Sequence, residues 1–165
     1  MKPTHLMKQI LWGKSFKKTL LRLILFTVPV TYILAKWLLL PTYIEGISME
    51  PTISDGKWIV VCTLKKPIAY NSIVCIRMSG NGVGYLKRIV GLPGDRIAFK
   101  EGKLFRNGTA ISEPYLKYSC DWEMEERLVE EGKIYVVGDN RSMLIEKHIH
   151  GLTDITRILG SPLFY

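Results

Sequence analysis

Two residues of this sequence, Ser48 and Lys87, carry side chains that together could break a peptide bond. A serine hydroxyl is a weak nucleophile until a base removes its proton. A lysine can be that base when burial favours the neutral amine over the charged ammonium. Taken singly, Ser48 would be a turn residue near a proline, and Lys87 would be a lysine at a strand edge. The hypothesis therefore requires a fold that brings both side chains together in apolar surroundings.

The segments around these two residues are typical of a turn and of a strand. Ser48 lies in GISMEPT (residues 46–52), where glycine and proline favour an irregular backbone. Lys87 lies in YLKRIV (residues 85–90), whose alternation puts a tyrosine and an isoleucine on the same strand face as the lysine. The turn GLPGD (residues 91–95) follows directly. Lys87 is therefore expected to have apolar neighbours on its own face.

The chain after residue 45 consists mainly of short β-branched or alternating runs, which favour strands. Expected strands lie at residues 57–62, 73–76, 85–90, 96–100, 103–106 and 134–137. Glu101-Gly102 and Asn107-Gly108 predict two tight hairpins over residues 96–111. The acidic residues 121–131 are expected to form a solvated loop or hairpin. The sequence predicts a mainly β fold, with one compact β domain.

The excess positive charge of the chain lies in its N-terminal part. The net charge is +8, and residues 1–44 carry seven basic and no acidic side chains. Residues 45–165 carry sixteen basic and fifteen acidic side chains, so their charges nearly cancel. A nucleic-acid-binding domain gathers its basic residues on one face or stripe of the domain. This distribution argues against a nucleic-acid partner.

The basic N-terminal part also contains an apolar segment that predicts a membrane anchor. Residues 19–40 would make about 33 Å of helix, which is enough to cross a bilayer. Six basic residues precede the apolar run, which predicts a cytoplasmic N-terminus. We expect a basic cytoplasmic arm at residues 1–18, a transmembrane helix at residues 19–42 and a catalytic β domain at residues 43–165. A cleaved secretory signal peptide and a buried helix of a soluble protein are the alternatives, although no small-x-small cleavage site follows the run.

Three segments resemble sequence motifs of the type I signal peptidases, in the same order after an N-terminal anchor. They are Ser-Met-x-Pro-Thr at residues 48–52, Lys-Arg-x-x-Gly-x-Pro-Gly-Asp at residues 87–95 and Gly-Asp-Asn-Arg at residues 138–141. The resemblance runs from about Gly46 to Gly151. It implies the fold of that family, with Ser48 attacking the scissile carbonyl and Lys87 acting as the general base.

The same resemblance implies supporting roles around these two residues. The backbone N–H of Ser48 would be one oxyanion-hole donor. Gly46 stands where some members carry a hydroxyl, so a backbone group or a water would have to serve as the second donor. Asp139 would pair with Arg88 and help to hold Lys87 in register. The other supporting residues expected at the site are Met49, Pro51, Gly138, Asn140, Arg141 and Glu146.

The sequence departs from the family pattern after Arg141. Leu144 stands where the family has a serine that hydrogen-bonds the lysine, and Glu146 keeps the acid that follows. His148 replaces the arginine that pairs with this acid. We expect Lys87 to be oriented less tightly, and the reaction to be slower, than in relatives with the serine.

No cofactor and no metal are expected from this sequence. His148 and His150 alternate on a possible strand, but two histidines without a third ligand are a weak metal signal. The three cysteines are an odd number and do not make a disulfide framework. Cys62 and Cys75 lie in two runs that are expected to pair as strands, so either a cross-strand disulfide or two buried thiols would fit.

These observations predict a membrane-bound serine endopeptidase that removes N-terminal signal peptides from exported preproteins. The substrate would bind extended along a strand edge. The resemblance to the type I signal peptidases implies small side chains at the first and third positions before the cut. The protein would lie in a bacterial inner membrane, with the β domain outside and against the lipid bilayer. Two alternatives stay open: a specialised relative that matures conjugative pilin-type substrates, and a non-catalytic membrane-anchored β module that binds extended peptides.

Overall fold

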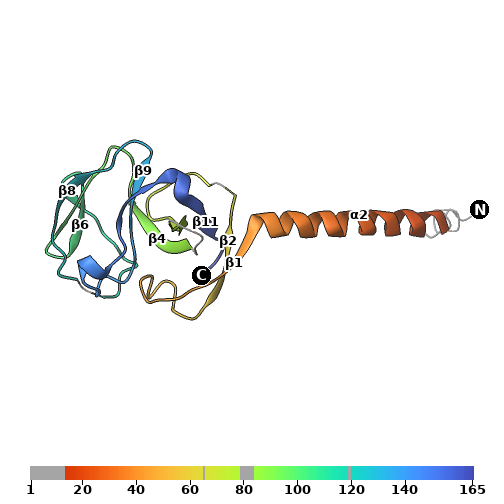
Figure 1. Ribbon diagram of the computed structural model, residues 1–165, viewed down its shortest axis with the longest axis horizontal. Coiled ribbons are helices and arrows are strands. Elements are labelled where there is room, and N and C mark those ends of the chain that lie inside the picture. Colours follow the sequence, from red (N-terminus) through yellow and green to blue (C-terminus); the bar gives the residue numbers. More distant parts are fainter. Residues whose placement is uncertain (1–13, 65, 79–83, 119) are drawn as a thin grey trace, which may run out of the picture. The chain divides into compact units, whose positions relative to one another are not determined.

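The computed structural model describes residues 14–64, 66–78, 84–118 and 120–165 (Figure 1). The chain divides into one unit that ends at Leu38 and a second unit that spans Leu39–Tyr165. The first unit contains a helix, and the second unit contains two antiparallel sheets.

The helix α2 (Lys14–Leu38) forms from the apolar N-terminal segment. Its stretch Phe16–Leu38 is long and apolar enough to cross a membrane, by length and composition. The helix ends before the expected boundary at residue 42, because residues 39–43 form the first strand instead. Pro41 lies in that strand, and a proline disfavours the helical conformation of the residue before it.

The larger sheet has seven strands in the order β1-β2-β11-β3-β4-β9-β10. Its strands are β1 (Leu39–Tyr43), β2 (Trp58–Cys62), β11 (Ile158–Pro162), β3 (Ile73–Arg77), β4 (Gly84–Gly91), β9 (Lys133–Val137) and β10 (Gly151–Asp154). Pro41 lies in the edge strand β1. A proline has no backbone N–H to donate and is tolerated in an edge strand rather than in the middle of a sheet.

The smaller sheet has four strands in the order β7-β6-β5-β8. Its strands are β5 (Arg96–Lys100), β6 (Lys103–Arg106), β7 (Thr109–Ala110) and β8 (Met124–Leu128). The two hairpins predicted over residues 96–111 are confirmed, and Glu101 and Asn107 adopt the positive φ angles of 49° and 54° that such tight turns need. Part of the acidic segment 121–131 is the edge strand β8 rather than a loop. The remaining short elements are the 3-10 helices η1 (Ile145–Lys147) and η2 (Ile155–Arg157).

The strand β11 separates β2 from β3, so these two strands do not pair as the sequence predicts. Cys62 lies opposite Ser161 of β11, and Cys75 lies opposite Gly160 of the same strand. Both thiols are free and buried. The cross-strand disulfide is therefore excluded, because a third strand lies between the two cysteines, and the buried-thiol alternative is correct.

The strand β4 is the rigid support of the domain, since it is hydrogen-bonded to β3 and β9 and is buried from Leu86 to Gly91. Its apolar residues belong to three core clusters. Leu86 packs with Met49 and Ile53, Ile89 belongs to a second cluster, and Val90 belongs to a third. A side chain carried by this strand is consequently held in place from both sides of the sheet.

Candidate active site

The structure brings Ser48 and Lys87 into direct contact. The Nζ atom of Lys87 lies 2.8 Å from the Oγ atom of Ser48, although the two residues are separated by 39 positions. Lys87 projects from the buried strand β4 and is 2% exposed, whereas Ser48 is half-buried in the loop between β1 and β2. The hydroxyl thus remains reachable from solvent while the amine is enclosed.

Burial lowers the pKa of Lys87 from its ordinary value of 10.5 to about 8. Removal of the amine from water disfavours the ammonium, and the negative charge of Asp139 opposes this effect in part. A substantial fraction of Lys87 is therefore neutral near pH 8. A neutral amine at hydrogen-bond distance can accept the proton of the Ser48 hydroxyl.

The loop that carries Ser48 is held by backbone contacts with the segment after β9. The backbone N–H of Asn140 donates to the Ser48 carbonyl at 3.0 Å, and the Asn140 side-chain amide donates to the Ile47 carbonyl at 3.1 Å. A side chain at Gly138 would collide with the Ser48 carbonyl oxygen, so this position requires glycine. Within the loop, Met49 is 2% exposed and fixes it to the core.

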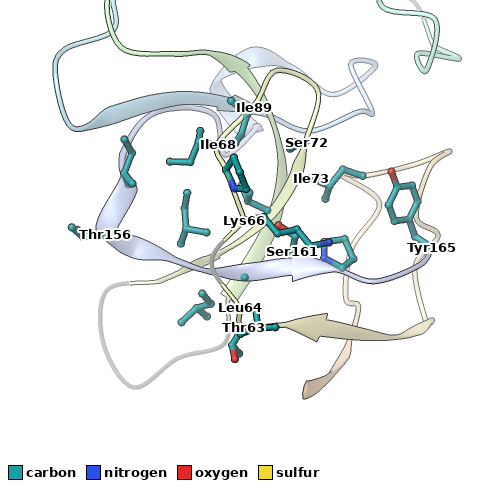
Figure 2. Close-up of a pocket in the computed structure, with 17 residues that line it drawn as sticks. Thr63, Leu64, Lys66, Ile68, Ser72, Ile73, Ile89, Thr156, Ser161 and Tyr165 are labelled. Carbon is teal, nitrogen blue, oxygen red and sulfur yellow. The ribbon is translucent and has the colours of Figure 1, made fainter. Parts of the chain in front are cut away.

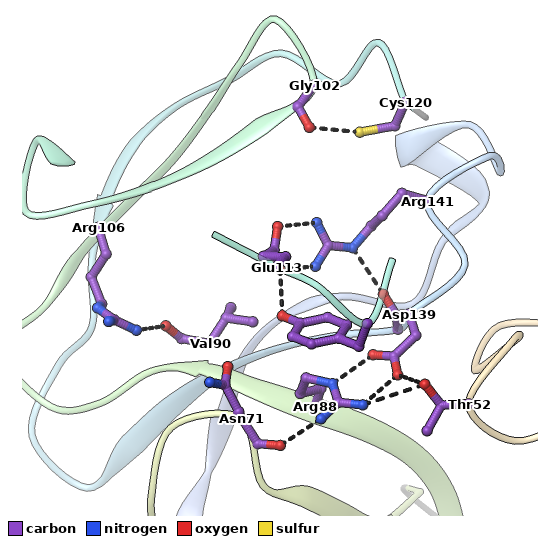
Figure 3. A network of polar contacts seen from close by, with 12 residues as sticks. Thr52, Asn71, Arg88, Val90, Gly102, Arg106, Glu113, Cys120, Asp139 and Arg141 are labelled. Carbon is purple, nitrogen blue, oxygen red and sulfur yellow. Dashed lines mark hydrogen bonds and ion pairs between the residues drawn. The ribbon is translucent and has the colours of Figure 1, made fainter. Parts of the chain in front are cut away.

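The Arg88–Asp139 ion pair that the resemblance implies is present and buried. Arg88 donates through Nε to Asp139 Oδ1 at 2.8 Å and through Nη2 to Oδ2 at 2.5 Å. The Thr52 hydroxyl donates to the same carboxylate, which links Asp139 to the Ser48 loop (Figure 3). Pro51, in contrast, is exposed on that loop and makes no side-chain contact of this network.

A comparison with protein families decides the relationship of the chain. The model of the family described as signal peptidase, peptidase S26, matches residues 17–163, which is nearly the whole chain. The chain belongs to this family. Membership makes it an enzyme, a serine peptidase of the hydrolase class, which is what the motifs at residues 48–52 and 87–95 predict.

Individual members of the family are similar over most of their length. Signal peptidase I of Bacillus licheniformis is 32% identical over 157 residues, which is 86% of this chain and 83% of that protein. Signal peptidase IB of Staphylococcus aureus (strain Mu50 / ATCC 700699) is 28% identical over 156 residues, with 82% and 81% covered. The crystal structure of a signal peptidase I from Enterococcus faecalis V583 is 26% identical, with a TM-score of 0.46, and covers 59% of this chain and 97% of that one.

Gly46, which was expected at the oxyanion hole without a side-chain hydroxyl, uses its backbone N–H for another contact. The Gly46 N–H donates to the Asp55 carboxylate at 2.7 Å, so this group is already engaged. The φ angle of Gly46 is 102°, a conformation that glycine adopts without strain. Among the described residues the backbone N–H of Ser48 has no acceptor, which leaves it available to a substrate oxygen.

In the described part of the chain, His148 does not take the place of the family's arginine as a partner of Glu146. Glu146 is exposed, and neither ring nitrogen of the buried His148 has a hydrogen-bond partner there. His148 instead packs edge-on against Trp122, with ring centroids 4.9 Å apart. Burial, with Lys87 and Arg141 adding to the effect, lowers the pKa of His148 to about 3, so its ring is neutral. Leu144 is 55% exposed, so much of its side chain faces solvent.

Sequence reasoning missed two residues of the polar network, Glu113 and Tyr115. Glu113 accepts two hydrogen bonds from the buried Arg141, at 2.6 and 3.2 Å, and a third from the Tyr115 hydroxyl at 2.5 Å. The Tyr115 ring lies 3.9 Å from Cζ of Arg88. The signal available in the sequence was an acid and an aromatic residue around Pro114, immediately after the predicted hairpins, but no spacing rule connects them to residues 88 or 141.

Glu113→Gln is expected to reduce the free energy of unfolding by about 3–5 kcal/mol, because it leaves the buried Arg141 without its counter-charge. Chemical unfolding of the detergent-solubilised protein would measure this loss. The matched control is Glu126→Gln, which breaks an exposed pair with Arg96 and should change stability far less. Equal effects of the two variants would contradict a structural role for the buried pair.

Figure 2 shows a cavity of about 320 Å³ that is formed by other residues. It is lined mainly by β3, β11 and residues 63–64 and 66–68, and neither Ser48 nor Lys87 contributes to its walls. Apolar side chains such as Ile68 and Ile73 dominate this lining. The cavity is therefore not the place where the proposed chemistry occurs.

Proposed function

We propose that this chain is a membrane-anchored endopeptidase that cuts signal peptides from exported preproteins, with Ser48 as nucleophile and Lys87 as general base. The observation that carries this proposal is the 2.8 Å contact between the enclosed Lys87 amine and the half-buried Ser48 hydroxyl. Family membership over residues 17–163 supports the same reaction and the same class of substrate.

The proposed reaction begins when Lys87 Nζ takes the proton of Ser48 Oγ. The oxygen attacks the scissile carbonyl carbon, a C–O bond forms, and the carbonyl oxygen becomes an oxyanion to which the Ser48 N–H donates. The Lys87 ammonium then gives its proton to the leaving nitrogen as the C–N bond breaks. In the second half, Lys87 deprotonates a water whose oxygen attacks the acyl carbon. The bond between this carbon and Ser48 Oγ then breaks, Lys87 returns the proton to Oγ, and the signal peptide leaves with a new carboxylate.

The proposed substrate is the extended end of a signal peptide with small side chains at the first and third positions before the cut. The purified full-length protein in detergent should cleave a precursor whose signal peptide ends in Ala-x-Ala. It should cut once, after the second alanine. A matched precursor with leucine in place of that alanine should remain intact. If well-folded protein left both precursors intact, the non-catalytic binding module would be the better interpretation, and selective cutting of a pilin-type precursor would favour the specialised relative.

The helix α2 is the proposed anchor, with residues 1–18 in the cytoplasm and the β domain on the outer side of the bacterial inner membrane. The charge asymmetry of the first 44 residues supports this orientation. Exposed apolar side chains of the β domain support contact of the domain with lipid. They are Tyr43, Ile47, Trp58, Leu163, Phe164 and Tyr165.

Protease added to right-side-out vesicles is expected to digest the β domain and to spare a fragment with the N-terminal arm. Inside-out vesicles are the control, because there the arm should be cut and the β domain should survive. Immunoblots against tags at the two ends would separate these results. Protection of the β domain in right-side-out vesicles would contradict the proposed orientation and, with it, access to exported substrates.

A further inference from the structure

We propose that Tyr115 is a positioning residue for the cleavage reaction, because its ring holds Arg88 on Asp139 and thereby keeps Lys87 able to accept a proton. This inference rests on the proposed function, since it concerns the base of that reaction. Three observations carry it: the enclosure of Arg88, the fixation of Tyr115, and the ion pair of Arg88 with Asp139, whose charge also acts on Lys87.

Arg88 is enclosed by contacts on its edges and on its face. Its Nε and Nη2 donate to Asp139, and its Nη1 donates to the Asn71 carbonyl at 2.7 Å (Figure 3). The face of the guanidinium is covered by the Tyr115 ring, 3.9 Å from Cζ. A cation is attracted to the face of an aromatic ring, so Tyr115 restricts movement of the guanidinium on the side that the ring covers.

Tyr115 is itself fixed by the neighbouring ion pair. Its hydroxyl donates to Glu113, and Glu113 is held by two hydrogen bonds from Arg141. Arg141 also donates through Nε to the Gly138 carbonyl at 2.9 Å. The segment that carries Glu113 and Tyr115 is thus joined to the segment that carries Gly138 and Asp139, which contacts the Ser48 loop.

The charge of Asp139 links the position of Arg88 to the protonation of Lys87, the proposed base. The Asp139 carboxylate favours the ammonium form of Lys87 and so works against the burial that lowers the pKa of Lys87. Arg88, paired with the same carboxylate, offsets that negative charge. If Arg88 moved away from Asp139, the carboxylate would act on Lys87 without this compensation, and Lys87 would hold its proton to a higher pH.

Other titratable groups also act on this site from several segments of the chain. Those that influence Lys87, Arg88 or Tyr115 are Asp139, Glu113, Arg141, His148, His150 and Tyr165. Burial lowers the pKa of His148 to about 3 and also lowers the pKa of His150, so both rings are neutral above pH 7. Burial raises the pKa of Tyr115, which stays neutral as well. Lys87 is therefore the group expected to titrate near pH 8.

The test is the pH dependence of kcat/KM for precursor cleavage by the full-length protein, with Tyr115→Met as the main variant. Methionine fills much of the volume but has no ring to cover Arg88. The midpoint of the rising acid limb should move to higher pH by about one pKa unit, so that kcat/KM falls about tenfold at pH 7 and recovers near pH 10. Tyr115→Leu is a second variant with the same expected shift, should the methionine variant fold poorly.

Two controls separate the ring of Tyr115 from its hydroxyl and from the segment around it. Tyr115→Phe keeps the ring over Arg88 and loses one of the contacts that fix it, so its midpoint should move much less than that of Tyr115→Met. Tyr118→Leu removes a tyrosine of the same segment whose ring contacts Lys117 rather than Arg88, and it should leave the profile unchanged.

A uniform loss of kcat/KM at every pH in Tyr115→Met and Tyr115→Leu would overturn the positioning role, as would unchanged profiles. A shift of equal size in Tyr115→Phe would assign the effect to the hydroxyl and would also overturn the role of the ring. Each of these results presupposes cleavage by the unmodified protein. Absence of that cleavage at all pH values would instead contradict the proposed function itself.

Discussion

Ser48→Ala is expected to fold normally and to lose precursor cleavage, with kcat lower by about 10⁶-fold. The proposed nucleophile is the Ser48 oxygen, which would pass its proton to the Lys87 Nζ atom that it contacts. The side chain is half-buried at the edge of the core, so removal of one oxygen atom should cost little stability. A gel assay with an Ala-x-Ala precursor, together with a thermal melt, would measure both properties.

The matched control for this variant is Ser54→Ala, which removes a hydroxyl from the same loop. Ser54 follows the buried Ile53 and is six positions from the proposed nucleophile, so the control should cleave at the rate of the unmodified protein. Near-normal processing by Ser48→Ala would contradict the assignment of the nucleophile. Equal losses in both variants would indicate that the loop, and not the Ser48 hydroxyl, is responsible.

Lys87→Arg is expected to be inactive between pH 6 and pH 10, because a guanidinium stays charged and cannot accept the Ser48 proton. In the unmodified protein, kcat/KM should rise with pH through a midpoint near the Lys87 pKa of about 8, since the neutral amine is the active form. Initial rates over this pH range would test both statements. An active Lys87→Arg protein, or a profile without an acid limb near pH 8, would rule out Lys87 as the base.

Lys87→Met separates the catalytic role of this residue from its effect on stability. Because the pKa of Lys87 is lower in the folded chain than in the unfolded chain, the unfolded chain binds more protons between pH 8 and 10.5. The free energy of unfolding should therefore rise with pH across this window by about 3 kcal/mol. This figure follows because each unit of pKa difference corresponds to about 1.36 kcal/mol. Lys87→Met should lack this rise and should be more stable than the unmodified protein at pH 7, although it is inactive. A parallel pH dependence of stability in both proteins would contradict the buried, neutral state of Lys87.

The local features of this molecule could be predicted from the sequence because they depend on neighbouring residues. The hairpins at Glu101-Gly102 and Asn107-Gly108 follow from residues that tolerate a positive φ angle. The strand β4 follows from alternation in residues 85–90, and the N-terminal helix follows from an apolar run. The pairing of Ser48 with Lys87 was predictable in another way, through motifs whose spacing resembles that of a known family.

The arrangement of the strands was not predictable in this way, because it depends on contacts between distant parts of the chain. The strand β11 comes from the C-terminal residues 158–162 and enters between β2 and β3, which excludes the disulfide between Cys62 and Cys75. Nothing in the local pattern of any of these three strands specifies its neighbours. Sheet order is chosen by the burial of whole faces, which is a property of the complete domain.

The sequence by itself determined the proposed chemistry of this protein: a serine and a lysine in recognisable motifs, a β domain to carry them, and an apolar segment before it. Only the tertiary structure decided which groups support that chemistry. It engages the Gly46 N–H with Asp55, leaves Glu146 exposed, and brings Glu113 and Tyr115 to Arg141 and Arg88. The physical reason is that a buried ion pair or a covered guanidinium requires precise contacts between segments far apart in the chain, whereas a sequence motif records residue types along one segment.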